Sequence, residues 1–155
     1  VIMTRTFSKI HGLGGIRLGW AYGPENIIDV LNRARGPFNV NSAALDAGVA
    51  AIKDQAFTKK CFLHNLKWLT WTRDQLRGLG LYATDSMGNF LLVEFDGKSK
   101  QNAAAADKFL QGVGIIVRSV ASYGLPNHLR ITIGTEKEMR CVIDALYQFM
   151  GKNSD

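Results

Sequence analysis

The segment over residues 4–20 combines short hydroxyl side chains, a lysine, a glycine-rich stretch and an arginine. Thr6 and Ser8 precede Lys9, and several glycines separate Lys9 from Arg17. A phosphate group is bound by short hydroxyl donors, by backbone N–H groups of a loop that approaches closely, and by a planar guanidinium. The segment offers all of these donors, so it predicts a phosphate-binding loop.

Lys9 lies directly beside these predicted phosphate donors. Neighbouring cations and partial removal from water lower the pKa of a lysine, and only the neutral amine condenses with an aldehyde. The position of Lys9 therefore favours a phosphorylated aldehyde as its cofactor. A Ser-Lys pair alone is a weak signal, because short motifs often match by chance. The combination of residues is far more specific than any of its parts.

The elements that position this segment follow from hydrophobic periodicity. Gly23 and Pro24 end a predicted strand, Gly36 and Pro37 separate two predicted helices, and Asn41 is a suitable helix cap. A longer helix follows, ended by Gly78. The pattern predicts a strand over residues 16–22 and helices over 25–33, 42–52 and 56–77.

The remainder of the chain alternates between strand and helix patterns. It predicts strands over residues 81–83, 90–95, 114–118 and 129–133, and helices over 103–111 and from Thr135 to Met150. In the last strand, Leu129 and Ile131 face one side, whereas Arg130 faces the other. Thr135 and Glu138 have the spacing of a capping box at the start of the final helix.

The change of pattern near Asp54 predicts a domain boundary. Residues 1–54 are expected to be an α/β piece whose other strands are missing, and residues 55–155 to be a small α+β domain with a core of its own. The chain also lacks an initiator methionine, and we expect it to open in mid-strand. We therefore expect it to be a fragment or a processed product.

Composition is that of an ordinary soluble domain, with 46% hydrophobic and 21% charged residues. No apolar run is as long as a membrane span. The net charge of +6 is scattered, and a nucleic-acid-binding module would show a basic cluster. Such a module is only a remote alternative, and no membrane partner is expected. Cys61 and Cys141 lack metal-site spacing, so we expect no metal and buried free thiols in a cytoplasmic protein.

Residues 6–20 (Thr-Phe-Ser-Lys-Ile-His-Gly-Leu-Gly-Gly-Ile-Arg-Leu-Gly-Trp) resemble the cofactor-lysine motif of the class I/II aminotransferases, which are fold type I pyridoxal-phosphate enzymes. Within them, the chain is most similar to the histidinol-phosphate aminotransferase family. The similarity continues, in the family's order, through residues 35–39, 89–90, 114–118 and 129–135. The resemblance implies an α/β fold: the end of a large cofactor-binding domain, followed by the small α+β C-terminal domain.

The resemblance also implies roles in cofactor binding. Lys9 matches the residue that holds pyridoxal phosphate covalently and, when released, moves a proton during amino transfer. Thr6, Ser8 and Arg17 match positions that bind the cofactor phosphate. The family's carboxylate for the ring nitrogen and its stacking aromatic precede this segment. These 155 residues alone are therefore expected to bind cofactor weakly and to be inactive.

Substrate-binding roles come from the resemblance as well. Arg130 matches the arginine that pairs with the carboxylate of the amino-acid or 2-oxo-acid partner. Arg118 is expected to meet the phosphate of histidinol phosphate, and Asn89 to line the same cleft. A solvated or structural arginine would show the same strand pattern, so alternation alone does not establish either arginine as a ligand.

The implied reaction converts L-histidinol phosphate and 2-oxoglutarate to imidazole acetol phosphate and glutamate, in histidine biosynthesis. An aminotransferase for aromatic or other amino acids and a pyridoxal-phosphate-dependent decarboxylase of phosphorylated amino acids are the alternatives, because one fold serves several substrates. A non-catalytic interaction domain would not need Lys9, Ser8 and Arg17 together. Family resemblance further implies a homodimer.

Overall fold

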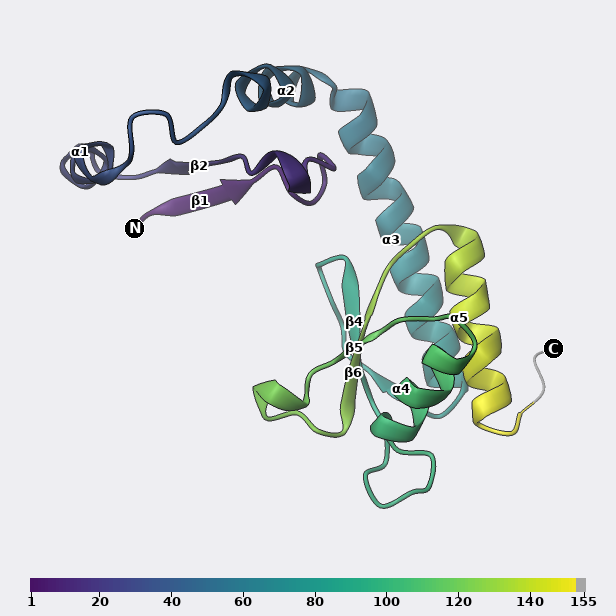
Figure 1. Cartoon of the computed structure of the whole chain (residues 1–155). Coiled ribbons are helices and arrows are strands. Elements are labelled where there is room, and N and C mark those ends of the chain that lie inside the picture. Colours follow the sequence, from purple (N-terminus) through teal and green to yellow (C-terminus); the bar gives the residue numbers. More distant parts are fainter. Residues whose placement is uncertain (153–155) are drawn as a thin grey trace. The chain divides into compact units, whose positions relative to one another are not determined.

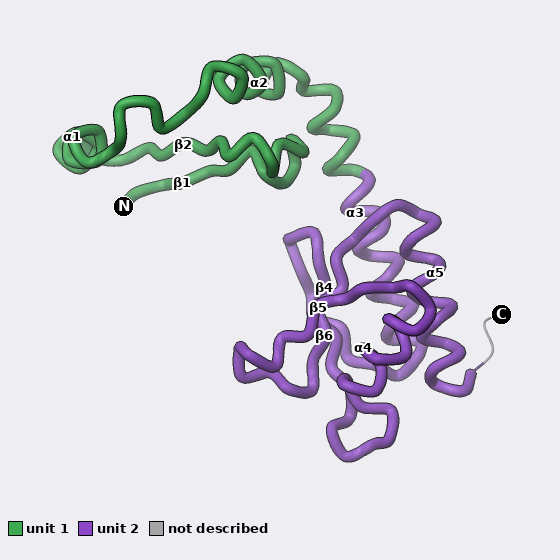
Figure 2. Tube along the Cα trace, viewed as in Figure 1, with its two compact units in different colours: residues 1–63 green, residues 64–155 purple. Residues whose placement is uncertain are grey.

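The computed structural model of the chain describes residues 1–152. It contains two compact units, one from Val1 to Leu63 and one from His64 onward (Figure 2). The division falls inside the long helix α3 (Gln55–Gly78). Asp54 lies at the start of this helix, where its carboxylate accepts a hydrogen bond from the N–H of Phe57 at 2.9 Å. The division into domains 1–54 and 55–155 stays a prediction.

The first unit begins with an antiparallel hairpin of β1 (Met3–Thr6) and β2 (Gly19–Tyr22). A short 3-10 turn, Gly14–Ile16, lies in the loop between the strands. The strand predicted over residues 16–22 is therefore wrong over its first three positions. Arg17 adopts a left-handed conformation with φ 60° and ψ 51°, which interrupts the extended backbone, so strand pairing starts only at Gly19.

The helices predicted in the first unit are confirmed as α1 (Glu25–Ala34) and α2 (Ser42–Lys53). Asn41 caps α2, because its side chain accepts a hydrogen bond from the N–H of Ala44 at 2.8 Å. Phe7 and Leu18 from the loop pack with Ala44 to form a small core. The apolar side chains of α1 are largely exposed in this chain, including Val30 and Leu31.

The second unit is an antiparallel sheet with helices on one face (Figure 1). The strand order is β3-β4-β6-β5. The helices α4 (Ala103–Gly112) and α5 (Glu136–Phe149) share one apolar core with α3 and the sheet. The strands are β3 (Tyr82–Ala83), β4 (Phe90–Glu94), β5 (Arg118–Ser119) and β6 (His128–Thr132).

Strand β6 shows the predicted alternation of its side chains. Leu129 and Ile131 are each 1% exposed, whereas Arg130 is only partly buried and Thr132 is exposed. The strand predicted over residues 114–118 is wrong over most of its length, because β5 begins only at Arg118. One face of β6 therefore packs into the core, and the opposite face presents Arg130.

The predicted capping box at the start of α5 is confirmed. The Glu138 carboxylate accepts hydrogen bonds from the backbone N–H of Thr135 at 2.7 Å and from its hydroxyl at 2.8 Å. The Thr135 hydroxyl accepts in turn from the N–H of Glu138. These hydrogen bonds favour the ionised carboxylate, so the pKa of Glu138 lies below its ordinary value of 4.5.

Cation–π contacts join α5 to α3. The Arg140 guanidinium lies 5.4 Å from the ring centroid of Trp68 and 5.2 Å from that of Trp71. The two indole rings meet edge to face, with centroids 5.1 Å apart. Such contacts contribute about 0.5–2 kcal/mol each, depending on burial. They help fix α5, and thus the end of β6, against the rest of the unit.

The prediction that both cysteines are buried is wrong. Cys61 is partly buried and Cys141 is exposed. The buried stripe of α5 runs through Met139, Val142 and Leu146, and position 141 lies off this stripe at helical spacing. Within residues 1–152, no group of His, Cys, Asp and Glu is arranged to hold a metal ion, and no helix is long and apolar enough to cross a membrane.

The substitution Glu138→Gln tests the capping box through pH. The pKa of Glu138 is lowered in the folded state, so its contribution to stability is present above pH 4.5 and is lost as the pH falls through the lowered pKa. We expect the wild type to lose stability over this acidic window more steeply than the variant, whose amide does not titrate. Urea denaturation at a series of pH values measures the difference.

The matched control is Glu25→Gln, in the first turn of α1, where no side-chain cap is formed. This control should follow the wild-type pH profile. If Glu138→Gln and the wild type lost the same free energy of unfolding as the pH falls, the proposed contribution of Glu138 would be contradicted.

Candidate functional site

The loop that carries the candidate cofactor residues is closed by the backbone of Phe7. The N–H of Phe7 donates to the carbonyl of Leu18 at 3.1 Å, and the carbonyl of Phe7 accepts from the N–H of Leu13 at 3.0 Å. Phe7 and Leu18 are only 5% and 9% exposed. Inside the loop, Gly12 has φ 69° and donates its N–H to the carbonyl of Lys9 at 2.9 Å. The ends of the loop are therefore fixed on a buried pair of residues.

The structure brings the predicted hydroxyls of Thr6 and Ser8 together. The hydroxyl of Thr6 donates to that of Ser8 at 2.9 Å and accepts from the backbone N–H of Ser8 at 3.0 Å. The proton of the Ser8 hydroxyl is left available, because a hydroxyl can donate one hydrogen bond while it accepts others. The end of β1 thus presents adjacent hydroxyl groups.

Arg17 is tied to the same loop. Its Nη1 donates to the carbonyl of Gly14 at 2.7 Å, and a Cβ added at Gly14 would lie 3.5 Å from the backbone oxygen of Ser8. Arg17 is the only residue other than glycine with a positive φ within residues 1–152. Such a conformation costs on the order of 1–3 kcal/mol and is typical of functional sites. Gly14 therefore lies between the Arg17 guanidinium and the backbone of Ser8.

Lys9 follows Ser8 directly and is exposed, so the partial removal from water expected from the sequence is not observed within residues 1–152. The structure thus gathers Thr6, Ser8 and Arg17 around one loop and leaves the amine of Lys9 accessible. Adjacent hydroxyls and a guanidinium are the donors that a phosphate monoester needs. The residues present therefore fit the phosphate of pyridoxal phosphate, and Lys9 is the residue that would supply an amine for its aldehyde.

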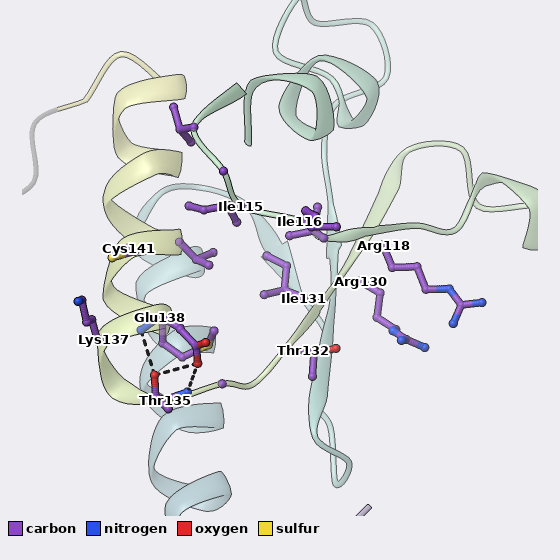
Figure 3. Close-up of a pocket in the computed structure, with 16 residues that line it drawn as sticks. Ile115, Ile116, Arg118, Arg130, Ile131, Thr132, Thr135, Lys137, Glu138 and Cys141 are labelled. Atoms are coloured by element: carbon purple, nitrogen blue, oxygen red, sulfur yellow. Dashed lines mark hydrogen bonds between the residues drawn. The ribbon is translucent and has the colours of Figure 1, made fainter. Parts of the chain in front are cut away.

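The two predicted substrate arginines lie opposite each other in the sheet of the second unit. Arg118 on β5 is the register partner of Arg130 on β6, so their side chains project from the same face. Figure 3 shows both side chains extending away from α5. Like charges directly opposite each other destabilise a sheet. Within residues 1–152, neither guanidinium forms an ion pair with a carboxylate.

Each arginine makes a cation–π contact that the sequence did not predict. The Arg130 guanidinium lies 5.1 Å from the ring centroid of Phe90, and that of Arg118 lies 5.5 Å from the ring centroid of Tyr123. The Nε atom of Arg130 is buried and has no hydrogen-bond partner within the described residues. An unsatisfied buried donor is costly, so an anionic ligand at Arg130 would be stabilised.

Asn89 immediately precedes β4 in the same unit. Its backbone carbonyl accepts a hydrogen bond from the N–H of Ile133 at 2.8 Å, which extends the pairing of β4 with β6. Its side chain is exposed. The structure places Asn89 at the end of the strand that carries Phe90, and its role as a substrate ligand stays a prediction.

A cavity of about 900 Å³ lies beside the arginines (Figure 3). Its walls come from residues 113–118, from β6 and from α5, and Ile115, Ile131 and Val142 are among its apolar lining residues. The side chains of Arg118 and Arg130 extend away from the α5 wall in this view. The cationic groups are therefore offered on the sheet face that α5 does not cover.

The comparison with protein families decides the assignment of the chain. The family model described as "Aminotransferase class I and II" matches residues 1–146. The chain belongs to this family. The predicted fold class, the α/β fold of fold type I aminotransferases, is thereby confirmed.

Relatives in the aminotransferase family are similar over almost the whole chain. A histidinol-phosphate aminotransferase of Maricaulis maris is 55% identical over 150 residues, covering 97% of this chain and 41% of the relative. One of Rhodospirillum rubrum is 56% identical over 149 residues, covering 96% of this chain and 40% of the relative. The chain therefore spans less than half the length of the curated relatives it matches.

A solved structure is similar to the same extent. The histidinol-phosphate aminotransferase of Sinorhizobium meliloti, in complex with pyridoxal-5'-phosphate, matches with a TM-score of 0.85 and 27% identity. The match covers 97% of this chain and 41% of that one. The likeness therefore includes both units of this aminotransferase-family chain.

Gly19→Ala tests the close approach of β2 to the end of β1. A Cβ at Gly19 would lie 2.8 Å from the backbone oxygen of Arg5 and 3.8 Å from the Cα of Thr6. Because a backbone atom cannot yield as a side chain can, the strands must separate, which costs about 1–3 kcal/mol. We expect a lower midpoint of chemical denaturation. Gly78→Ala is the control, since no atom other than its chain neighbours and the backbone of its own helix lies within 4 Å of the added Cβ, and equal effects of the two changes would contradict the close approach.

Proposed function

We propose that the whole protein is a pyridoxal-phosphate-dependent aminotransferase of histidine biosynthesis. It transfers the amino group of L-histidinol phosphate to 2-oxoglutarate, giving imidazole acetol phosphate and glutamate. The observation that carries the proposal is the pair of arginines, Arg118 and Arg130, that face one another across β5 and β6 without a carboxylate partner within residues 1–152. The names of the relatives support the same substrate.

The charge of the two arginines suits both substrates of this reaction. The amino donor carries a phosphate with a charge of about −2, and 2-oxoglutarate carries two carboxylates. Arg130 binds the carboxylate next to the reacting carbon of the 2-oxo acid, where a planar guanidinium matches two oxygens. Arg118 binds the phosphate of the donor, or the second carboxylate of the acceptor. Binding of either dianion relieves the repulsion between the guanidinium groups.

The loop of the first unit holds the cofactor in this proposal. Thr6, Ser8 and Arg17 bind the phosphate, and Lys9 holds the aldehyde carbon covalently. Pyridoxal phosphate, when bound, would supply an electron sink for breaking the C–H bond of the amino-bearing carbon. The amine of Lys9, when released, accepts and returns the proton that moves during amino transfer. Its exposed, unconstrained side chain leaves it free to do so.

The whole protein is further proposed to be a cytoplasmic homodimer. The resemblance to biosynthetic aminotransferases supports this assembly and location. Sedimentation velocity of the whole protein tests the assembly, and a monomer that is active at assay concentration would contradict it.

Borohydride reduction of the whole protein tests the role of Lys9. Wild-type protein mixed with pyridoxal phosphate should show the absorbance of the bound aldehyde, and reduction should fix the label on the peptide that contains Lys9. Lys9→Arg keeps the positive charge but cannot condense with the aldehyde. We expect this variant to lose the label and to reduce kcat by about 10²–10⁴-fold or more, because its proton carrier is absent.

Lys59→Arg, at an exposed position of α3, is the matched control and should keep both label and activity. A label found on another lysine would contradict the assignment of Lys9. Release of CO2 from a phosphorylated amino acid, with no amino transfer, would instead favour the decarboxylase alternative.

Arg118→Gln tests the recognition of the substrate phosphate. Removing the guanidinium should lower kcat/KM for L-histidinol phosphate by about 10–100-fold, because a hydrogen-bonded charge contact is lost. Activity with L-histidinol, which lacks the phosphate, should fall much less. Steady-state assays with both amino donors measure the ratio of kcat/KM for L-histidinol phosphate to that for L-histidinol.

Arg33→Gln, on the exposed surface of α1, is the control and should leave the ratio unchanged. Equal losses with both donors would favour an aminotransferase for aromatic or other amino acids, with Arg118 in a structural role.

A further inference from the structure

Tyr123 contacts the guanidinium of Arg118 in two ways. The Nη2 of Arg118 donates a hydrogen bond to the phenolic oxygen at 2.6 Å, and the guanidinium carbon lies 5.5 Å from the ring centroid. Both contacts act on the same flexible side chain. Together they restrict the guanidinium to one position beside β5, which lowers the entropy cost of binding an anion there.

The backbone around Tyr123 is itself held in place. Tyr123 ends a 3-10 turn, Ala121–Tyr123, and its N–H donates to the carbonyl of the buried Val120 at 2.9 Å. Gly124 closes the turn with φ 79° and donates its N–H to the carbonyl of Ala121 at 3.0 Å. This positive φ favours glycine. The phenol is therefore presented from a rigid turn that follows β5 directly.

The phenolic proton is available to a ligand. A tyrosine hydroxyl has one donor and can accept as well, and Arg118 uses only its accepting capacity. Within residues 1–152, the phenol donates no hydrogen bond. A hydroxyl that accepts from a cation is polarised and becomes a stronger donor. Tyr123 is 63% exposed, so a ligand at Arg118 has access to this proton.

The two arginines differ in their supports, and this difference suits two different anions. Phe90 stacks on Arg130 without offering a hydrogen bond, so the Arg130 end presents a guanidinium alone, which matches the two oxygens of a carboxylate. The Arg118 end presents a guanidinium and a phenolic O–H. A phosphate monoester has three terminal oxygens and can use the additional donor.

We propose that Tyr123 is a specificity-determining residue that recognises the substrate phosphate together with Arg118. It orients the guanidinium and donates its own hydroxyl proton to a phosphate oxygen. The inference rests on the proposed function and deepens it, because it assigns the preference for a phosphorylated amino donor to a pair of side chains. A tyrosine that only stabilised the turn would not need an exposed hydroxyl.

Tyr123→Phe in the whole protein tests the proposal, because it removes the hydroxyl and keeps the ring. L-Histidinol phosphate and L-histidinol, each with 2-oxoglutarate, are the matched amino donors. We expect kcat/KM for the phosphorylated donor to fall by about tenfold or more, mainly through KM, since a hydrogen bond to a charged group is lost. We expect less than about a twofold change with L-histidinol, as the part of the substrate that reacts does not contact the phenol.

Tyr82→Phe is the matched control, because Tyr82 is an exposed tyrosine on β3 in the same unit. This variant should leave kcat/KM with both amino donors unchanged. In the double variant Arg118→Gln/Tyr123→Phe, the loss of kcat/KM for L-histidinol phosphate should be smaller than the product of the two single losses, because the phenol acts partly through Arg118. Equal losses with both donors, or a lower melting temperature with an unchanged ratio, would overturn the proposal in favour of a structural role.

The proposed function can fail separately from this inference. A wild-type protein without activity on L-histidinol phosphate would contradict the proposed function. Calorimetric titration of the cofactor-loaded protein with inorganic phosphate then tests Tyr123 alone. Weaker binding by Tyr123→Phe than by the wild type would support the phosphate contact, and equal affinities would overturn it.

Discussion

Paired hydrogen bonds of Phe7 hold both ends of the loop that carries Ser8 and Lys9. The N–H of Phe7 bonds to Leu18 and its carbonyl to Leu13, so the loop cannot open without unpairing a buried backbone group. The contact depends on close packing against α2, where a Cβ at Gly48 would lie 2.5 Å from the Leu18 side chain. A small residue on one helix thus determines how near the loop can approach, and the position of the candidate phosphate donors follows from it.

The arrangement of the arginines depends on a different constraint, the register of the second sheet. Because side chains alternate along a strand, a slip of one residue would turn Arg130 into the core and expose Leu129 and Ile131. Burial of those apolar residues against the helices therefore fixes the position of the guanidinium. The same pairing sets Arg118 opposite Arg130. The electrostatic cost of that placement is tolerated because the register is enforced by the hydrophobic core.

Local signals in the sequence predicted most of the helices and the face of β6, because periodicity and caps are short-range features. The capping box of Thr135 and Glu138 is an example. The sequence also predicted that the candidate phosphate-binding residues lie on one loop, although their roles stay predictions. It did not predict the left-handed Arg17, because non-glycine residues rarely adopt that conformation. Nor did it predict the contact of Tyr123 with Arg118, because a tyrosine in a turn is common and the pattern does not show how the short turn after β5 directs its side chain.

The candidate site residues are restrained to different degrees. The candidate anion-binding groups are held by hydrogen bonds: Arg17 by the carbonyl of Gly14, and Arg118 by the hydroxyl of Tyr123. Fixed donors lose little entropy when a phosphate or carboxylate binds. The amine of Lys9 instead forms no hydrogen bond within residues 1–152, and its side chain is exposed. In the proposed function, Lys9 must release the cofactor and then carry a proton, which needs several side-chain positions, and the freedom of its amine is consistent with that role.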